Sequence, residues 1–266
     1  MPPQPKPRVI AVTNQKGGVG KTTTAINLGA ALASLGKKTI IFDLDPQGNA
    51  STGLGIDPGQ RQLTTYDLLL DDAPFESVIH KTSIKNLDLA PATTDLSSTD
   101  VELVDHENRV FLLKEAIISN TGVIYDYILI DCPPSLSLLT VNALVAADAV
   151  LVPLQSEFFA LEGLSQLMLT VRDVRETANP NLRIEGVVLT MYDQRNNLCR
   201  LVEEDARDTL GDMVFQTRIP RNVRVSEAPS YALPVLQYDP NSKGSLAYIA
   251  LAEELLERDT TLREPA

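Results

Sequence analysis

The sequence is poor in cysteine and lacks long apolar runs. Its 266 residues include two cysteines, Cys132 and Cys199, and the chain does not open on a hydrophobic run. These absences argue against a disulfide-stapled scaffold and against a secreted protein. No uninterrupted apolar stretch reaches the roughly 18–20 residues that cross a bilayer, because Asp148 interrupts the best candidate. We therefore expect a cytoplasmic protein with no membrane segment.

Basic residues are also scarce, and their distribution is uneven. The chain has 23 Lys and Arg against 35 Asp and Glu, a net charge of −12 that at first sight disfavours a nucleic-acid partner. Nearly all of this excess lies in two acidic segments, residues 66–107 and 253–266, whose contacts the sequence does not identify. A third segment, residues 213–226, contains three arginines and no acid. The total charge therefore does not exclude DNA.

Short apolar runs alternate with helical patterns along the chain. Residues 9–12, 39–42, 127–130, 149–152 and 187–189 are typical of strands buried on both faces, with weaker candidates at 87–90 and 214–215. Helical patterns cover residues 22–35, 138–146, 162–177, 198–210 and 245–257. This alternation predicts an α/β fold with a single doubly wound, mostly parallel sheet and helices on both faces. We expect one domain over residues 8–258, with a disordered tail at 1–7 and a flexible tail at 259–266.

A glycine-rich turn lies between the first strand and the first helix. Residues 15–23 read QKGGVGKTT, so backbone N–H groups and the helix N-terminus can face phosphate oxygens. Lys21 is expected to reach the β- and γ-phosphates and the Thr22 hydroxyl to bind Mg²⁺. The strict pattern G-x-x-x-x-G-K-[ST] is not met, because Gln15 stands where its first glycine belongs. The predicted nucleotide-binding set is Lys16, Gly17, Gly18, Val19, Gly20, Lys21, Thr22 and Thr23.

Carboxylates follow two of the predicted strands. Asp43 and Asp45 come after residues 39–42, and a period of two places them on the same side of the strand end. Asp131 ends the apolar run at 127–130 in the manner of a Walker B acid. Parallel strands bring such residues to one edge of the sheet, where ligands bind. Asp131 is therefore expected to hold Mg²⁺ through its hydration shell.

Residues 16–23 resemble the deviant Walker A motif of the ParA/MinD branch of P-loop ATPases, which is marked by an additional lysine, here Lys16. The resemblance covers about residues 8–257. The runs FFALEG at 158–163 and VRVSEAP at 223–229 make it closer to the ParA/Soj chromosome-partitioning ATPases. It implies that Lys16 crosses a dimer interface to the partner's nucleotide, that Asp45 positions or polarises the attacking water, and that Asp43 supports the phosphate-binding loop and the metal.

The same resemblance implies contacts with the base of the nucleotide and with DNA. The residues that border the adenine are expected to be Met191, Pro220 and Asn222. The expected DNA contacts are Arg195 and Arg224, with Arg221 and Lys243 as plausible additions. A few phosphate contacts per subunit, doubled by dimerisation, give weak and salt-sensitive binding without sequence preference.

The function implied is that of an ATPase that partitions a chromosome or a plasmid. Mg-ATP closes a homodimer that binds double-stranded DNA nonspecifically in the nucleoid, and a ParB-type centromere-binding partner stimulates an otherwise weak hydrolysis that releases it. The alternative is a MinD-like ATPase that positions itself on a membrane or a cell pole, or a regulatory scaffold without DNA binding. The acidic C-terminal segment, with Glu253, Glu254 and Glu257, disfavours a helix that lies on anionic lipid.

Overall fold

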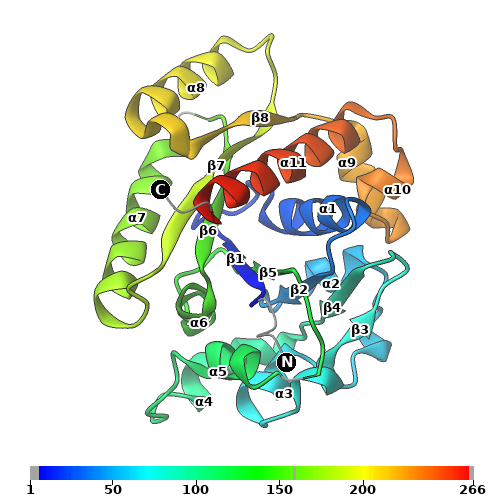
Figure 1. Ribbon diagram of the computed structural model, residues 1–266, viewed down its shortest axis with the longest axis vertical. Helices are drawn as coiled ribbons and strands as arrows, with labels where there is room; N and C mark the ends of the chain where they lie inside the picture. The colour runs from blue at the N-terminus through cyan, green and yellow to red at the C-terminus, as the bar shows by residue number, and fades with distance from the viewer. Residues whose placement is uncertain (1–5, 121, 158–159, 264–266) are drawn as a thin grey trace.

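The apolar runs of the sequence form the strands of one twisted sheet (Figure 1). The computed structural model describes residues 6–120, 122–157 and 160–263. Within them the strand order is β3-β4-β2-β5-β1-β6-β7-β8, and every pair is parallel except β3 with β4. The strands are β1 (Arg8–Val12), β2 (Thr39–Asp43), β3 (His80–Lys81), β4 (Leu87–Ala90), β5 (Tyr127–Asp131), β6 (Ala149–Gln155), β7 (Arg183–Tyr192) and β8 (Val214–Pro220).

Helices cover both faces of the sheet, so the predicted doubly wound α/β fold is confirmed. They are α1 (Lys21–Ser34), α2 (Asn49–Gly53), α3 (Thr65–Leu70), α4 (Thr99–Glu102), α5 (Leu112–Ser119), α6 (Leu138–Ala146), α7 (Ala160–Thr177), α8 (Asn197–Leu210), α9 (Val223–Glu227), α10 (Val235–Tyr238) and α11 (Lys243–Arg263). Figure 1 shows α1 and α11 side by side on one face. Side chains of β1 alternate between the layers, because Val9 and Ala11 pack toward α6 and α7 while Ile10 and Val12 pack toward α1 and α11.

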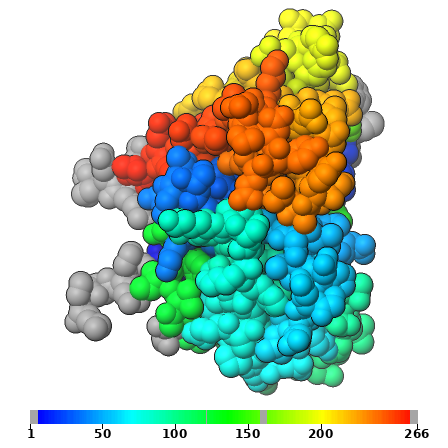
Figure 2. Space-filling model, turned by 90° about the vertical axis from the view of Figure 1, so that its right-hand side faces the viewer, coloured from blue at the N-terminus to red at the C-terminus, as the bar shows by residue number. Residues whose placement is uncertain are grey.

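The short helices near the C-terminus extend the layer that contains α1. The Val235 N–H of α10 donates a hydrogen bond of 2.7 Å to the Asn27 side-chain oxygen of α1. Figure 2 shows this segment, in orange, against the blue and cyan residues that follow β2. Ala232 approaches Gly55 there, so that a Cβ built on Gly55 would lie 3.5 Å from the Ala232 Cβ. The C-terminal third of the chain therefore covers the helix that starts at the glycine-rich turn.

The structure extends several predicted elements and adds short ones. Helix α11 runs to Arg263, past the expected domain boundary at residue 258, because Asp259 is buried in contacts with the sheet. Residues 1–5 of the expected N-terminal tail, residues 158–159 of the FFALEG run and residues 264–266 lie outside the described residues. In the described part of the chain, no helix is long and apolar enough to cross a membrane.

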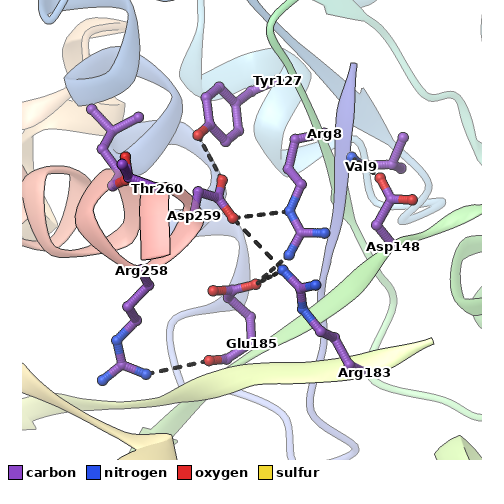
Figure 3. Close-up of polar contacts among 10 residues, drawn as sticks. Arg8, Val9, Tyr127, Asp148, Arg183, Glu185, Arg258, Asp259 and Thr260 are labelled. Carbon is purple, nitrogen blue, oxygen red and sulfur yellow. Dashed lines mark hydrogen bonds and ion pairs between the residues drawn. The ribbon is translucent and has the colours of Figure 1, made fainter. Parts of the chain in front are cut away.

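A cluster of buried charges joins α11 to the amino ends of three strands (Figure 3). Arg8 of β1 lies 2.5 Å from a Glu185 oxygen of β7 and 3.1 Å from an Asp259 oxygen of α11. The Tyr127 hydroxyl of β5 donates a 2.7 Å hydrogen bond to the second Asp259 oxygen. Arg183 lies within 3.6 Å of Glu185 and 3.8 Å of Asp259. Charges buried in this way are stabilising only as a complete set, because a partner left alone is a desolvated charge.

Replacing Asp259 with alanine should therefore destabilise the fold strongly. Asp259→Ala leaves Arg8 with one fewer counter-ion in a buried position, and the free energy of unfolding should fall by about 3–5 kcal/mol. Urea denaturation followed by circular dichroism measures this loss. Glu204→Ala, at an exposed position of α8, is the control and should stay within about 0.5 kcal/mol of the wild type. A loss no larger than that of the control would contradict the role of the cluster.

Candidate nucleotide site and basic groove

The glycine-rich loop has the backbone geometry that its glycines predict. Gly18 and Gly20 adopt left-handed conformations, with φ of +75° and +89°, and Gly20 precedes the first residue of α1. A side chain at either position would be strained. A Cβ built on Gly17 or Gly18 would meet no atom of this chain within 4 Å. The outer side of the loop is therefore open, so a ligand or a second molecule can approach its backbone.

Two buried residues that the sequence analysis did not single out hold the loop in place. The Asn14 amide donates to the Pro153 carbonyl of β6 at 2.8 Å, and its oxygen accepts the Lys16 N–H at 3.1 Å. The Thr190 hydroxyl of β7 donates to the Val19 carbonyl at 2.8 Å. Asn14 and Thr190 are polar residues that follow apolar runs of the sequence. This is the only sequence signal that could have indicated their role in holding the loop. The loop is thus tied to strands β6 and β7 as well as to its own flanking elements.

The two lysines of the loop have different environments. Lys21 is almost fully buried, and its ammonium donates to the Lys16 carbonyl at 3.1 Å. Burial lowers the pKa of Lys21, while the nearby Asp131, Cys132 and Asp45 oppose the shift. The Lys16 ammonium lies near the surface and pairs with the Glu157 carboxylate at 2.7 Å. Lys21 therefore faces the interior of the site and Lys16 faces outward.

Strand register places Asp43 and Asp131 beside each other at the end of β2 and β5, as the sequence predicts. In the strand register, Asp43 of β2 lies opposite Asp131 of β5. Val12 of β1, which leads into the loop, lies opposite Asp131 on the other side. Both carboxylates are completely buried. Burial raises the pKa of Asp131 well above its ordinary range, and the neighbouring Asp43 raises it further, while Thr22 and Lys21 lower it.

Asp131 is the acid whose chemistry fits a divalent cation. Within the described residues, neither of its buried oxygens has a hydrogen bond of normal geometry, although Thr22 lies close by. A buried carboxylate without a partner is costly unless a cation or a bound water compensates it. Asp131 and the Thr22 hydroxyl therefore suit a hydrated Mg²⁺ next to the phosphates.

Asp43, in contrast, has its oxygens occupied by the following segment. One accepts the Asp45 N–H at 3.2 Å, and the other accepts the Ser51 N–H at 2.9 Å and the Ser51 hydroxyl at 2.7 Å. Burial raises the pKa of Asp43 to about 6, and the bonds from Ser51 oppose this rise. In this structure the Asp43 carboxylate therefore holds the loop that follows β2, and its expected support of the phosphate-binding loop and the metal stays a prediction.

Asp45 lies at the bend of the same loop. Its carboxylate accepts the Gln47 N–H at 3.0 Å, and its carbonyl accepts the Gly48 N–H at 2.8 Å. Gly48 has a φ of +60° and precedes α2. These bonds fix the direction of the Asp45 side chain, which is only slightly exposed and faces the same sheet edge as Lys21 and Asp131.

The residues expected around adenine lie together beside the loop. A cavity of about 240 Å³ is lined by Gly20 and Thr23 together with Met191, Pro220 and Asn222. Met191 follows Thr190 in a left-handed conformation, with a φ of +51°, which is unusual for a side chain of this size. Asn222 caps α9 by accepting the Arg224 N–H at 2.8 Å. A planar base can enter this cavity while its phosphates follow the loop.

A larger groove with basic walls adjoins this cavity. Its volume is about 760 Å³, and Arg195, Arg221 and Lys243 line it, together with Arg218, which the sequence analysis did not assign to DNA. Arg224 does not line it. Pro220 and Arg221 belong to both cavities and so form a shared wall. The cavity beside the glycine-rich loop and the basic groove are therefore direct neighbours.

Acidic side chains of the same chain pair with most of these arginines. Asp193 accepts two bonds from the Arg195 guanidinium, at 3.0 and 2.9 Å, and these hold the pKa of Asp193 at about 2. Arg218 pairs with Glu203 at 2.5 Å. Arg224 lies 3.0 Å from Glu227 and 3.3 Å from Asp239. Within the described residues, Arg221 and Lys243 make no ion pair.

A glycine-rich loop between a buried strand and a helix, facing a buried carboxylate on a neighbouring strand, defines a P-loop nucleoside triphosphatase. Residues 7–184 match the family model described as "AAA domain". The chain is 56% identical over 254 residues to the chromosome partitioning protein ParA of Caulobacter vibrioides, covering 95% of each protein. It is 52% identical over 251 residues to the sporulation initiation inhibitor protein Soj of Bacillus subtilis, covering 93% of this chain and 98% of Soj. The chain belongs to the ParA/Soj family.

Solved structures support this fold and connect it with nucleotide. A Mycobacterium smegmatis protein, described as cobyrinic acid a,c-diamide synthase with bound ADP and magnesium, superposes with a TM-score of 0.84. The two proteins are 37% identical, and the match covers 97% of each chain. The description names an amide-forming enzyme, whereas the more similar ParA and Soj are named for partitioning and sporulation.

The raised pKa of Asp43 predicts a pH-dependent contribution to stability. In the folded protein this pKa is raised from 3.8 to about 6, so the unfolded chain binds fewer protons than the folded chain between these values. The contribution of Asp43 to the free energy of unfolding is therefore present at low pH and falls as the pH rises through about 4 to 6. Asp43→Asn, which cannot titrate, should lack this fall. Urea denaturation of both proteins at several pH values in this window tests the expectation, and identical pH dependence would contradict it.

Proposed function

We propose that this protein is a Mg²⁺-dependent ATPase that partitions a chromosome or a plasmid. The observation that carries the proposal is the buried Asp131 carboxylate, whose oxygens have no hydrogen bond of normal geometry within the described residues, next to a loop that presents Lys21 and Thr22. Support for the partitioning role comes from the similarity to ParA of Caulobacter vibrioides over almost the whole chain. ParA and Soj are more similar in sequence than the structure described as an amide-forming enzyme, which favours partitioning over that activity.

Hydrolysis would use residues from three elements of the sheet edge. Lys21 and the backbone N–H groups of the loop bind the β- and γ-phosphates, and Thr22 and Asp131 hold Mg²⁺, with Asp131 acting through water. Mg²⁺, when bound, neutralises charge on the phosphate oxygens. Asp45 orients the attacking water, and Asp43 keeps the Asp45 loop in place through Ser51. Met191, Pro220 and Asn222 enclose the adenine.

Dimerisation would complete the site and the DNA-binding surface. Lys16 extends outward from the open side of the loop and is proposed to contact the phosphates bound by the partner subunit. Arg195, Arg221 and Lys243 in the groove, with Arg224 nearby, would contact DNA phosphates without sequence preference. A ParB-type centromere-binding protein would stimulate hydrolysis and release the subunits from the nucleoid. ATP binding thus shifts the population toward the DNA-bound dimer.

Removal of the Asp45 carboxylate should stop hydrolysis but leave ATP binding intact. Asp45→Ala is therefore expected to accumulate as an ATP-bound dimer that remains on DNA. Light scattering after size-exclusion chromatography, with ATP or ADP and with a DNA duplex, measures the mass of the complex. A variant that stays monomeric with ATP, while the wild type dimerises, would contradict the role assigned to Asp45.

Charge reversal in the basic groove should separate dimerisation from DNA binding. Arg195→Glu should abolish nonspecific duplex binding with ATP while the dimer still forms, because the Arg195 side chain is 90% exposed and supports no buried contact. Arg175→Glu, at an exposed position of α7, makes the same change of charge away from the groove.

A salt titration of duplex binding with ATP against ADP gives the number of DNA phosphates that the protein neutralises, since each phosphate contributes about 0.9 to the slope. Normal DNA retention by Arg195→Glu, or equally weakened binding by Arg175→Glu, would contradict the assignment. Wild-type protein that binds anionic liposomes and ignores DNA would instead favour a membrane-positioning ATPase.

A further inference from the structure

The outward-facing lysine of the loop is held by an acid of its own chain. The Lys16 ammonium lies 2.7 Å from one carboxylate oxygen of Glu157, which follows β6. The Lys16 side chain is 36% exposed and the Glu157 side chain 48% exposed, so both groups remain accessible to solvent. Lys16 and Glu157 are 141 positions apart in the sequence and meet only because β6 pairs with β1. The function proposed above does not use Glu157.

The Glu157 carboxylate is directed toward Lys16 by the end of β6. Its second oxygen accepts a hydrogen bond of 2.5 Å from the side-chain amide of Gln155, the last residue of that strand. The Glu157 N–H also donates to the Gln155 carbonyl at 2.8 Å. Each carboxylate oxygen therefore has one partner, and Gln155 keeps the other oxygen available for Lys16.

The backbone of Lys16 is fixed independently of this ion pair. Its N–H donates to the Asn14 side chain at 3.1 Å, and its carbonyl accepts the Lys21 ammonium at 3.1 Å. Asn14 is in turn bonded to Pro153 of β6. Loss of the ion pair would therefore free the Lys16 side chain while these backbone contacts of the loop remain. This separation makes it possible to test the pair without removing the loop.

We propose that Glu157 is a positioning residue that holds Lys16 on its own subunit until the phosphates of a partner's nucleotide replace the carboxylate. The inference rests on the proposed function, in which Lys16 acts across a dimer interface. Closing the dimer exchanges two Lys16–Glu157 pairs, one from each subunit, for two contacts with phosphate. Glu157 thereby opposes dimerisation of subunits and sets how much ATP-bound protein is needed to form the dimer.

The size of the effect follows from the exposure of the pair. A solvent-exposed ion pair contributes little, so the exchange adjusts the equilibrium and does not block it. With two pairs broken for each dimer, removal of the carboxylate charge should tighten ATP-dependent dimerisation by about 2- to 30-fold. The same removal should leave a loop that still binds nucleotide through Lys21.

A dimerisation assay with matched variants tests this proposal. Glu157→Gln keeps an oxygen and the size of the side chain but removes the charge, Glu157→Asp keeps the charge, and Glu204→Gln makes the neutralising change on exposed α8. Sedimentation with saturating Mg-ATP should give a lower dimer dissociation constant for Glu157→Gln. Glu157→Asp should return toward the wild type and Glu204→Gln should equal it. A dissociation constant that is unchanged or higher in Glu157→Gln, while the wild type dimerises, overturns the inference alone.

A chemical cross-link reports the contact without relying on activity. A carbodiimide joins a lysine amine to a carboxylate that it touches, so nucleotide-free wild-type protein should yield an intrachain Lys16–Glu157 amide detectable by peptide mass spectrometry. Addition of Mg-ATP to the Asp45→Ala variant should abolish this product, because Lys16 then contacts phosphate. A cross-link that persists in the ATP-bound dimer overturns the inference. A wild type that never dimerises with ATP overturns the proposed function instead, whatever the cross-link shows.

Discussion

The parallel register of β2, β5 and β1 is the constraint on which the rest of the site depends. It places Asp43, Asp131 and Val12 side by side, so two carboxylates and the phosphate loop meet at one edge. Two of these strands are anchored at their opposite ends, because Arg8 starts β1, Tyr127 starts β5, and both contact Asp259. The repulsion of two buried acids, which destabilises one edge, is thus opposed by a set of paired charges at the other.

Cations pair with nearby acids at the surface of the protein as well as in the buried cluster around Arg8. Arg195, Arg218 and Arg224 each pair with an acid of the same chain, and so does Lys16. The negative total charge of the sequence therefore does not describe the groove, where cations predominate along the walls, although two of them, Arg195 and Arg218, are already paired with acids. A polyanion must compete with these acids, which fits the weak and reversible DNA binding that we propose for this protein.

The elements predicted most successfully from the sequence are those with local signals. Buried strands, the loop at residues 15–23 and Asp131 at a strand end all leave a pattern within about ten residues. Asn14, Thr190 and Glu157 were missed because their partners lie 139, 171 and 141 positions away, and only the strand order brings them together. The position of Asp259 in α11 depends on a similar distant contact, since Asp259 pairs with Arg8 at the start of β1. The grouping of Met191, Pro220 and Asn222 came from family resemblance and not from periodicity.

The buried charge cluster also determines when the fold can be completed during synthesis. A ribosome delivers Arg8 first, Glu185 much later and Asp259 among the last residues of the fold. Until α11 has been made, Arg8 of β1 and Arg183 of β7 lack the Asp259 carboxylate as a counter-charge. Their burial is then less favourable, although the whole phosphate loop has already been made. The nascent chain therefore contains every residue of the loop long before α11, whose Asp259 pairs with the start of β1, has been made.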